Sequence, residues 1–180
     1  MRKSPILAAV LLLSACTNSP ESRYFTLSTT QPRQAPAQDR PQFHLAMVKL
    51  PELYDRPQLV TRSSPQSVEI DEYDRWAEPL ERMTARILAQ DIALRRPRAA
   101  GPVPAGADQP RLQVAVDEFA ADRSAGRAVL SGNWKIVEND GTTRGRAFSF
   151  SQAVSGGDSA AVAGAMSALL GQLADEIDRE

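Results

Sequence analysis

Cysteine and histidine are almost absent from this sequence of 180 residues, which has only Cys16 and His44. A lone thiol cannot form a disulfide within its own chain, so the fold must be held by its hydrophobic core. A histidine metal site would need carboxylate ligands that the sequence does not place beside His44. The composition therefore argues against a disulfide-stapled scaffold and against a histidine-based metal centre.

Neither sign of charge dominates, and no apolar run is long. The 21 basic and 22 acidic residues give a formal net charge of −1, which lacks the basic excess typical of nucleic-acid-binding proteins. The main apolar run, residues 6–15, contains Ser14 as its only polar residue. Its helical length of about 15 Å is half the roughly 30 Å of a hydrocarbon core, so it is too short to span a membrane.

The amino-terminal run has the layout of an export signal. Arg2 and Lys3 precede it, and small residues end it. The following Leu13-Ser14-Ala15-Cys16 resembles the lipobox of bacterial lipoproteins, in which the cysteine receives a diacylglyceryl group and, after cleavage, an N-acyl chain such as palmitate. The alternative is an ordinary secretory peptide cut near Ala15, which would leave Cys16 as a free thiol.

Lipidation of Cys16 would decide where the protein resides. One acyl chain binds a bilayer marginally, whereas two or more hold it firmly. The residue after the cysteine is Thr17, and lipoproteins without aspartate there are by resemblance sent to the outer membrane, on its periplasmic face. We expect a signal peptide at 1–15, a lipidated terminus and linker at 16–41, and one periplasmic domain at 42–180.

The first half of the mature chain predicts short strands and one linker. Residues 24–27 are expected as a short strand, and residues 28–41 read as an unstructured linker rich in proline and glutamine. Residues 43–50 are mostly apolar and predict a central strand. Residues 58–62 and 67–71 predict a small hairpin.

Two amphipathic helices are expected. The first begins near Pro79, ends before Pro97, and has apolar residues at three- and four-residue spacing (Leu80, Met83, Ile87, Leu88, Ile92). Asp158 is a suitable N-cap for the second, whose buried face comprises Val162, Met166, Leu169, Leu173 and Ile177. Residues 97–110, between the first helix and the next strand, predict a surface loop.

Three strands at 111–119, 127–137 and 142–152 alternate apolar and polar residues, which predicts a meander. A two-residue turn at Asp140-Gly141 would put Phe148 and Phe150 on the face opposite Trp134. A three-residue loop that includes Asn139 pairs Glu138 with Thr142 and brings both rings onto the face of Trp134. We favour the longer loop, with Gly141 left-handed, because a one-residue slip would invert the apolar face.

These elements together predict an α+β fold. The sheet is expected to be mainly antiparallel, with both helices packed on one face in a two-layer sandwich. The apolar faces suffice for the sheet and helices to cover each other, with no surplus to line a lipid tunnel.

No common catalytic motif occurs. The sequence has no Gly-x-Ser-x-Gly elbow, no phosphate-binding Gly-x-x-x-x-Gly-Lys loop and no His-Glu-x-x-His pair. Asp71, Glu72 and Asp74 cluster beside Arg75. Paired carboxylates of this kind suit a lipoprotein glycosidase, but a solvated turn balanced by Arg75 is the favoured interpretation.

Several blocks carry a family resemblance: LPELYDRPQLVTR (50–62), DRWAEPLERMTARILAQDI (74–92), YFTL (24–27) and the lipobox. Together they resemble the PqiC family (the paraquat-inducible protein C group) of ABC-type transport auxiliary lipoproteins. The resemblance implies a subunit without catalytic activity or cofactor, which works with MCE-domain proteins and inner-membrane transport components in lipid transport between membranes. A peptidoglycan-associated structural lipoprotein remains the alternative, and assembly of several copies is left open.

Part of the first block is expected to bind a partner. Pro57 favours an extended Arg56, and tyrosine and arginine are frequent interface anchors. Trp76 either meets a partner or fills the seam between sheet and helix, and Arg56 either meets a partner or pairs with Asp55 or Glu52. The candidate partner-binding residues are Tyr54, Asp55, Arg56, Arg62, Trp76 and Glu78.

Overall fold

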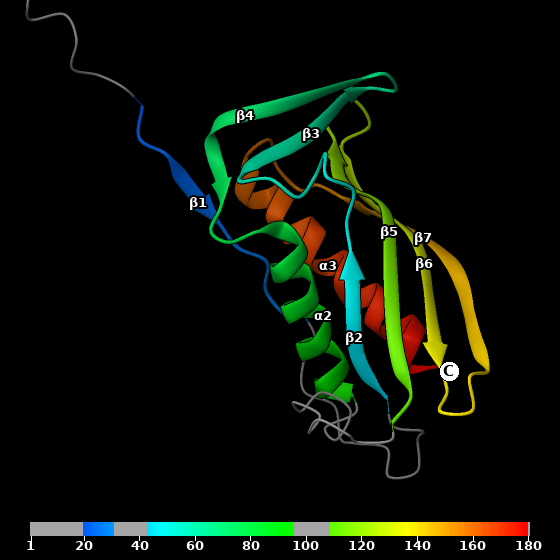
Figure 1. Cartoon of the computed structure of the whole chain (residues 1–180). Coiled ribbons are helices and arrows are strands. Elements are labelled where there is room, and N and C mark those ends of the chain that lie inside the picture. The colour runs from blue at the N-terminus through cyan, green and yellow to red at the C-terminus, as the bar shows by residue number, and fades with distance from the viewer. Residues whose placement is uncertain (1–19, 31–42, 96–108, 180) are drawn as a thin grey trace, which may run out of the picture.

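The computed structural model describes residues 20–30, 43–95 and 109–179. These residues form a two-layer α+β fold with both helices on one face of a single sheet (Figure 1). The predicted signal peptide, Cys16 and most of the predicted linker at 28–41 lie outside the described residues. The elements, in order, are β1 (Arg23–Phe25), β2 (His44–Lys49), β3 (Gln58–Ser64), β4 (Ser67–Trp76), α2 (Leu80–Arg95), β5 (Arg111–Asp122), β6 (Arg127–Val137), β7 (Thr143–Ala153) and α3 (Ser159–Asp178).

The sheet is mixed, and its pairing is consistent with the mainly antiparallel sheet that the sequence predicts. Its strands follow the order β1-β4-β3-β5-β6-β7, and β2 also pairs with β5. The pairs β3–β4, β5–β6 and β6–β7 are antiparallel, whereas β1–β4, β2–β5 and β3–β5 are parallel. The parallel pairs arise where segments distant in sequence join the hairpin and the meander.

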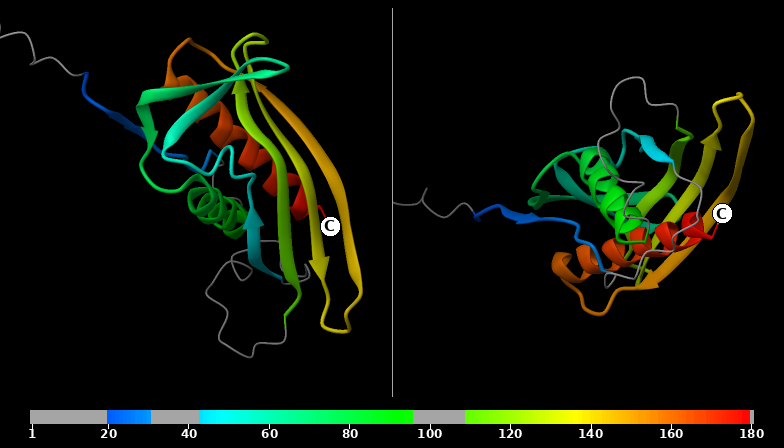
Figure 2. Two further views of the ribbon diagram at one scale, coloured as in Figure 1. Left: turned by 45° about the horizontal axis from the view of Figure 1, so that its top comes forward. Right: turned by 90° about the horizontal axis from the view of Figure 1, so that it is seen from below.

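The meander has the predicted register. The Glu138 amide donates to the Thr142 carbonyl at 2.9 Å, and Gly141 is left-handed with φ of 85°. Phe150 lies opposite Leu130 and Phe148 opposite Gly132, so both rings share the inner face with Trp134. The longer loop is therefore confirmed. Figure 2 shows these strands curving around α3.

Both helices bury the faces that their spacing predicts. Met83 and Leu88 of α2 are 0% exposed, as are Leu169 and Ile177 of α3. Burying an aliphatic side chain of this size contributes about 1.5–3 kcal/mol. The Asp158 carboxylate accepts a hydrogen bond from the Ala161 amide at 2.8 Å, as expected for an N-cap.

Two predictions about the strands were wrong. The expected central strand at 43–50 is β2, which among the described residues pairs only with β5. The second strand of the hairpin was expected to end at Asp71, but β4 continues to Trp76 and bends near Asp71, where four residues oppose a single residue of β3. This extension lets β4 pair with β1.

Candidate functional site

The amino-terminal strand is fastened to the fold by an ion pair. Arg23 Nε and Nη2 donate to the two carboxylate oxygens of Asp74, each at 2.7 Å, and the Ser159 hydroxyl donates to Asp74 at 2.5 Å. Burial of Asp74 opposes its ionisation, but the hydrogen bonds from Arg23 and Ser159 outweigh burial and lower its pKa. Asp74 thus joins β1, β4 and the start of α3.

The residues that follow β1 are fastened as well. The Ala77 amide donates to the Phe25 carbonyl at 2.9 Å. Leu27 is 2% exposed, and its amide lies 3.1 Å from Met83 Sδ of α2. The Ser28 amide donates to the Ser167 hydroxyl of α3 at 3.1 Å. Residues 23–28 therefore belong to the folded body, in the region where the sequence predicts a short strand at 24–27.

A polar cluster lies on the sheet face opposite the helices. Arg62 of β3 forms a 3.4 Å ion pair with Glu118 of β5. Tyr54, from the segment between β2 and β3, is buried beside them. Its pKa is raised, first by burial and then by Glu118, while Arg62 opposes the rise. The guanidinium of Arg62 and the carboxylate of Glu118 are each partly exposed, by about a third and a quarter of their surface.

Two other candidates, Asp55 and Glu78, lie outside this cluster and each contacts α2 near its start. The Asp55 carboxylate accepts from the Glu81 amide at 2.9 Å and so satisfies a free amide of the first helical turn. Glu78 accepts from Arg86 Nε at 3.1 Å. Both acidic side chains therefore have a local structural role at this helix end.

The structure resolves the alternative for Trp76 that the sequence left open, and the role of Arg56 stays a prediction. Trp76 is 4% exposed in the core cluster, so it fills the seam and does not present its ring to a partner. Arg56 is half-buried, and its Nε has no hydrogen-bond partner among the described residues. Of the six candidates, the structure brings Tyr54 and Arg62 into one cluster. The third member of this cluster is Glu118, a residue that the sequence analysis did not single out.

The carboxylates considered for catalysis have structural roles. Asp71 accepts from the Tyr73 and Asp74 amides at 3.0 and 2.8 Å, which makes the bend in β4. Asp74 is 1% exposed and paired with Arg23, so the expectation of a solvated cluster balanced by Arg75 was wrong for this residue. Within the described ranges, no three acidic, histidine or cysteine side chains are placed to hold a metal ion.

Neither helix of the described residues has the length and apolar character needed to cross a bilayer.

Comparison with known proteins agrees with this architecture. A crystal structure of an uncharacterized protein superimposes with a TM-score of 0.72 at 20% identity, covering 88% of this chain and 97% of the other. Protein XCC0632 from Xanthomonas campestris, of the DUF330 family, superimposes with a TM-score of 0.71 at 21% identity, covering 87% and 92%. None of the curated proteins matches the sequence. Residues 25–178 match one family over nearly the whole folded body, and the chain belongs to the ABC-type transport auxiliary lipoprotein components.

Proposed function

We propose that this protein is a non-catalytic auxiliary subunit of an MCE/ABC-type lipid transport system, anchored by acyl chains on Cys16 to the periplasmic face of the outer membrane. Its work is to hold a partner protein at that membrane. The observation that carries the proposal is the position of β1, which joins the folded body directly after the lipobox.

The length of the tether supports a docking role. Arg23 follows Cys16 by seven residues, and an extended chain covers at most ~3.6 Å per residue, or about 25 Å. Because Arg23 is held by Asp74, the domain stays within this distance of the leaflet. Such a domain suits a fixed collar for a partner that spans the periplasm better than a mobile carrier.

Two surfaces are proposed for the partner. One is the cluster of Arg62, Glu118 and the buried Tyr54, with Arg56 in the preceding segment. The other is the start of α2, with Asp55 and Glu78. Arginine is enriched at interface centres because its planar guanidinium binds carboxylates with two hydrogen bonds, so Arg56 and Arg62 are the expected anchors.

The anchor is tested by mass spectrometry of the mature terminus and by cell fractionation. We expect a triacylated Cys16 at the first position and recovery in the outer-membrane fraction. A Cys16→Ser variant should lose the membrane fraction, whereas a Ser14→Ala variant, which keeps a small residue before the cysteine, should retain it. Recovery of the wild-type protein in osmotic-shock fluid with a free thiol would contradict the anchor.

The partner is tested by photo-crosslinking in intact cells. A photoreactive residue replaces Leu53, which is exposed in the segment that carries Arg56, and a matched one replaces Asn139 in the exposed hairpin at the other end of the sheet. We expect adducts with an MCE-domain protein from position 53 only, and co-purification of that protein in mild detergent. Capture of peptidoglycan in place of a protein would instead favour a structural lipoprotein.

A further inference from the structure

Exposed apolar side chains concentrate on the two strands at one end of the sheet. Among the described residues, Tyr24 is 66% exposed, Ile70 47%, Tyr73 40% and Val68 37%. Tyr24 belongs to β1 and the other three to β4. We call these four residues the edge patch. Two other large apolar side chains of the described residues, Met47 and Leu53, are exposed elsewhere. The four residues of the edge patch lie on two paired strands, which distinguishes them from isolated exposed apolar residues.

The register places the edge patch on the sheet face that the helices leave open. Tyr24 lies opposite Arg75, on the side away from the buried Asp74 and Trp76. Tyr73 shares this side with Arg75 because side chains alternate along a strand. Ile70 and Val68 pair with Val60 and Arg62 of β3.

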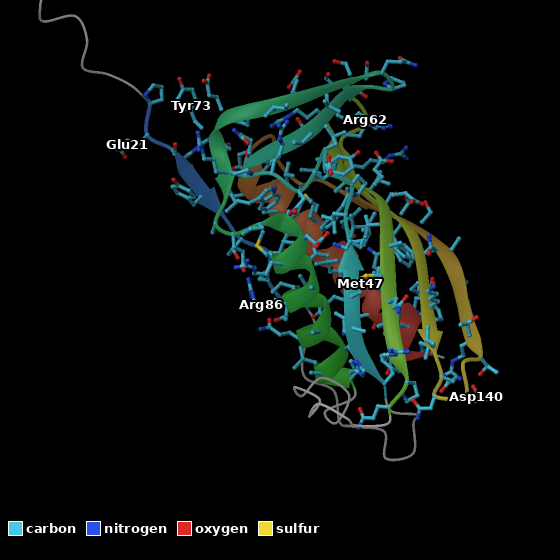
Figure 3. All side chains as sticks on the ribbon, in the orientation of Figure 1. Glu21, Met47, Arg62, Tyr73, Arg86 and Asp140 are labelled. Carbon is cyan, nitrogen blue, oxygen red and sulfur yellow. The ribbon has the colours of Figure 1, made fainter. Side chains whose placement is uncertain are left out.

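Tyr24 and Tyr73 of the patch lie at the corner where the described chain begins, a few residues after Cys16 in the sequence. Figure 3 places Glu21 and Tyr73 at one corner of the molecule and Asp140 at the opposite end. Tyr24 follows Cys16 by eight residues, and its neighbour Arg23 is fixed to Asp74. A lipid on Cys16 therefore brings this corner, and not the hairpin at Asp140, to the membrane surface.

The chemistry of the edge patch suits a headgroup layer. Tyrosine is enriched where a protein meets the membrane–water interface, because its ring is apolar and its hydroxyl is polar. Charged side chains of both signs surround the patch. Glu21, Glu69 and Glu72 are exposed, Arg23 beside Tyr24 is largely exposed, and Arg62 and Arg75 lie opposite Val68 and Tyr24. A balanced set of charges suits a zwitterionic lipid surface, which presents both ammonium and phosphate groups.

We propose that the edge patch is a membrane-contact surface, in which Tyr24, Ile70 and Tyr73 lie in the zwitterionic headgroup layer of the leaflet that holds the Cys16 lipid. This inference rests on the proposed function, because it requires the anchor. The acyl chains and the edge patch then contact the membrane at two points. Two contacts fix the orientation of the domain, so the sheet face with Arg62 keeps one orientation relative to the membrane.

The test uses the full lipidated protein in vesicles of phosphatidylethanolamine and phosphatidylcholine that contain a headgroup spin label. A Glu72→Cys variant carries an environment-sensitive fluorophore beside the edge patch, and an Asp140→Cys variant carries it at the far end. Lipidated Cys16 has no free thiol, so each label is unique. We expect several-fold stronger quenching at position 72 than at 140, and near-equal quenching once Tyr24→Ser and Tyr73→Ser are added.

The outcomes separate this proposal from the anchored function. If the protein floats with the vesicles but position 72 is quenched no more than position 140, the edge patch does not contact lipid and the proposal is wrong. Self-quenching at position 72 that rises with surface density would assign the patch to a second copy and overturn the proposal. A protein that does not float contradicts the anchor itself.

Discussion

Arg23 and Asp74 lie 51 residues apart in the sequence and are joined by two hydrogen bonds of 2.7 Å. Arg23 is largely exposed, whereas Asp74 is buried and also accepts a hydrogen bond from the Ser159 hydroxyl. The pair thus connects the amino-terminal segment with the interior of the fold.

Replacing this arginine should release β1. In an Arg23→Gln variant, amide exchange in residues 23–28 should be several-fold faster than in the wild type, because the edge strand loses its charged hydrogen bonds. In the wild type, the lowered pKa of Asp74 adds stability at pH values above about 3.9, which is the pKa of an aspartate in the unfolded chain. This stability is lost as the pH falls through the lower pKa that Asp74 has in the folded state. The variant should therefore unfold at a higher pH in an acid titration. Arg75→Gln, whose side chain bonds only the Glu72 carbonyl in the described residues, is the matched control and should leave the exchange unchanged.

Asp91 should make the protein less stable as the pH rises. Its side chain is 0% exposed, and neither carboxylate oxygen has a hydrogen-bond partner among the described residues. Burial raises the pKa of Asp91 to about 6. The positive charge of Arg95 lowers this pKa, and the negative charge of Asp175 raises it further, but both effects are smaller than that of burial. Between about pH 4 and 6 the folded state holds a proton that the unfolded state has lost, so the unfolding free energy falls by up to roughly 3 kcal/mol.

Urea unfolding from pH 4 to 7 measures this effect. In Asp91→Asn the decline should disappear between pH 4 and 6. Asp140→Asn is the control, because the Asp140 carboxylate is fully exposed and its pKa is lowered by hydrogen bonds from Thr142. A carboxylate with a lowered pKa does not make stability fall as the pH rises, so this variant should show the same decline as the wild type. An unchanged slope in Asp91→Asn would show that another group causes the decline.

Gly132 should not tolerate even one methyl group. A Cβ atom there would lie 2.2 Å from the Ala115 carbonyl oxygen of the neighbouring strand. Gly132→Ala should therefore reduce the unfolding free energy by at least 1–3 kcal/mol, the usual cost of overpacking a core. Gly164→Ala is the control, because a Cβ in that helical position meets nothing within 4 Å. It should raise stability by about 0.5–1 kcal/mol, and thermal unfolding compares the two variants.

Arg62 should matter for partner binding more than for stability. Its ion pair with Glu118 is partly exposed, and pairs of this kind contribute about 0–1 kcal/mol. Arg62→Gln should leave thermal unfolding nearly unchanged but reduce co-purification of the MCE-domain partner. Arg144→Gln is matched closely, since Arg144 forms an equally long 3.4 Å pair with Glu138 at the other end of the sheet. Equal co-purification by both variants would remove Arg62 from the proposed interface.

Local sequence patterns predicted those parts of the fold that depend on neighbouring residues. The N-cap at Asp158 and the loop at Gly141 follow from capping and turn chemistry, and the face shared by Trp134 and Phe148 follows from strand alternation. The two buried helix faces follow from their spacing in the same way.

Long-range pairing was beyond the reach of these patterns. The buried position of Asp74 depends on Arg23, and nothing in the local periodicity of β4 indicates a partner 51 residues away. The parallel pairs of β1 and β2 likewise depend on strands that follow much later. At the candidate site, the sequence singled out Tyr54 and Arg62 but not Glu118, which stands on the polar side of β5 like any solvated residue.

The contact of Arg23 with Asp74 and Ser159 depends on parts of the chain that are made at very different times. Asp74 follows Arg23 by 51 residues, and Ser159 follows Asp74 by a further 85. Synthesis proceeds from the amino terminus, so the first strand of the fold cannot complete its polar contacts until the last helix has begun to emerge. The earliest segment of the described chain is therefore among the last to become fully fixed.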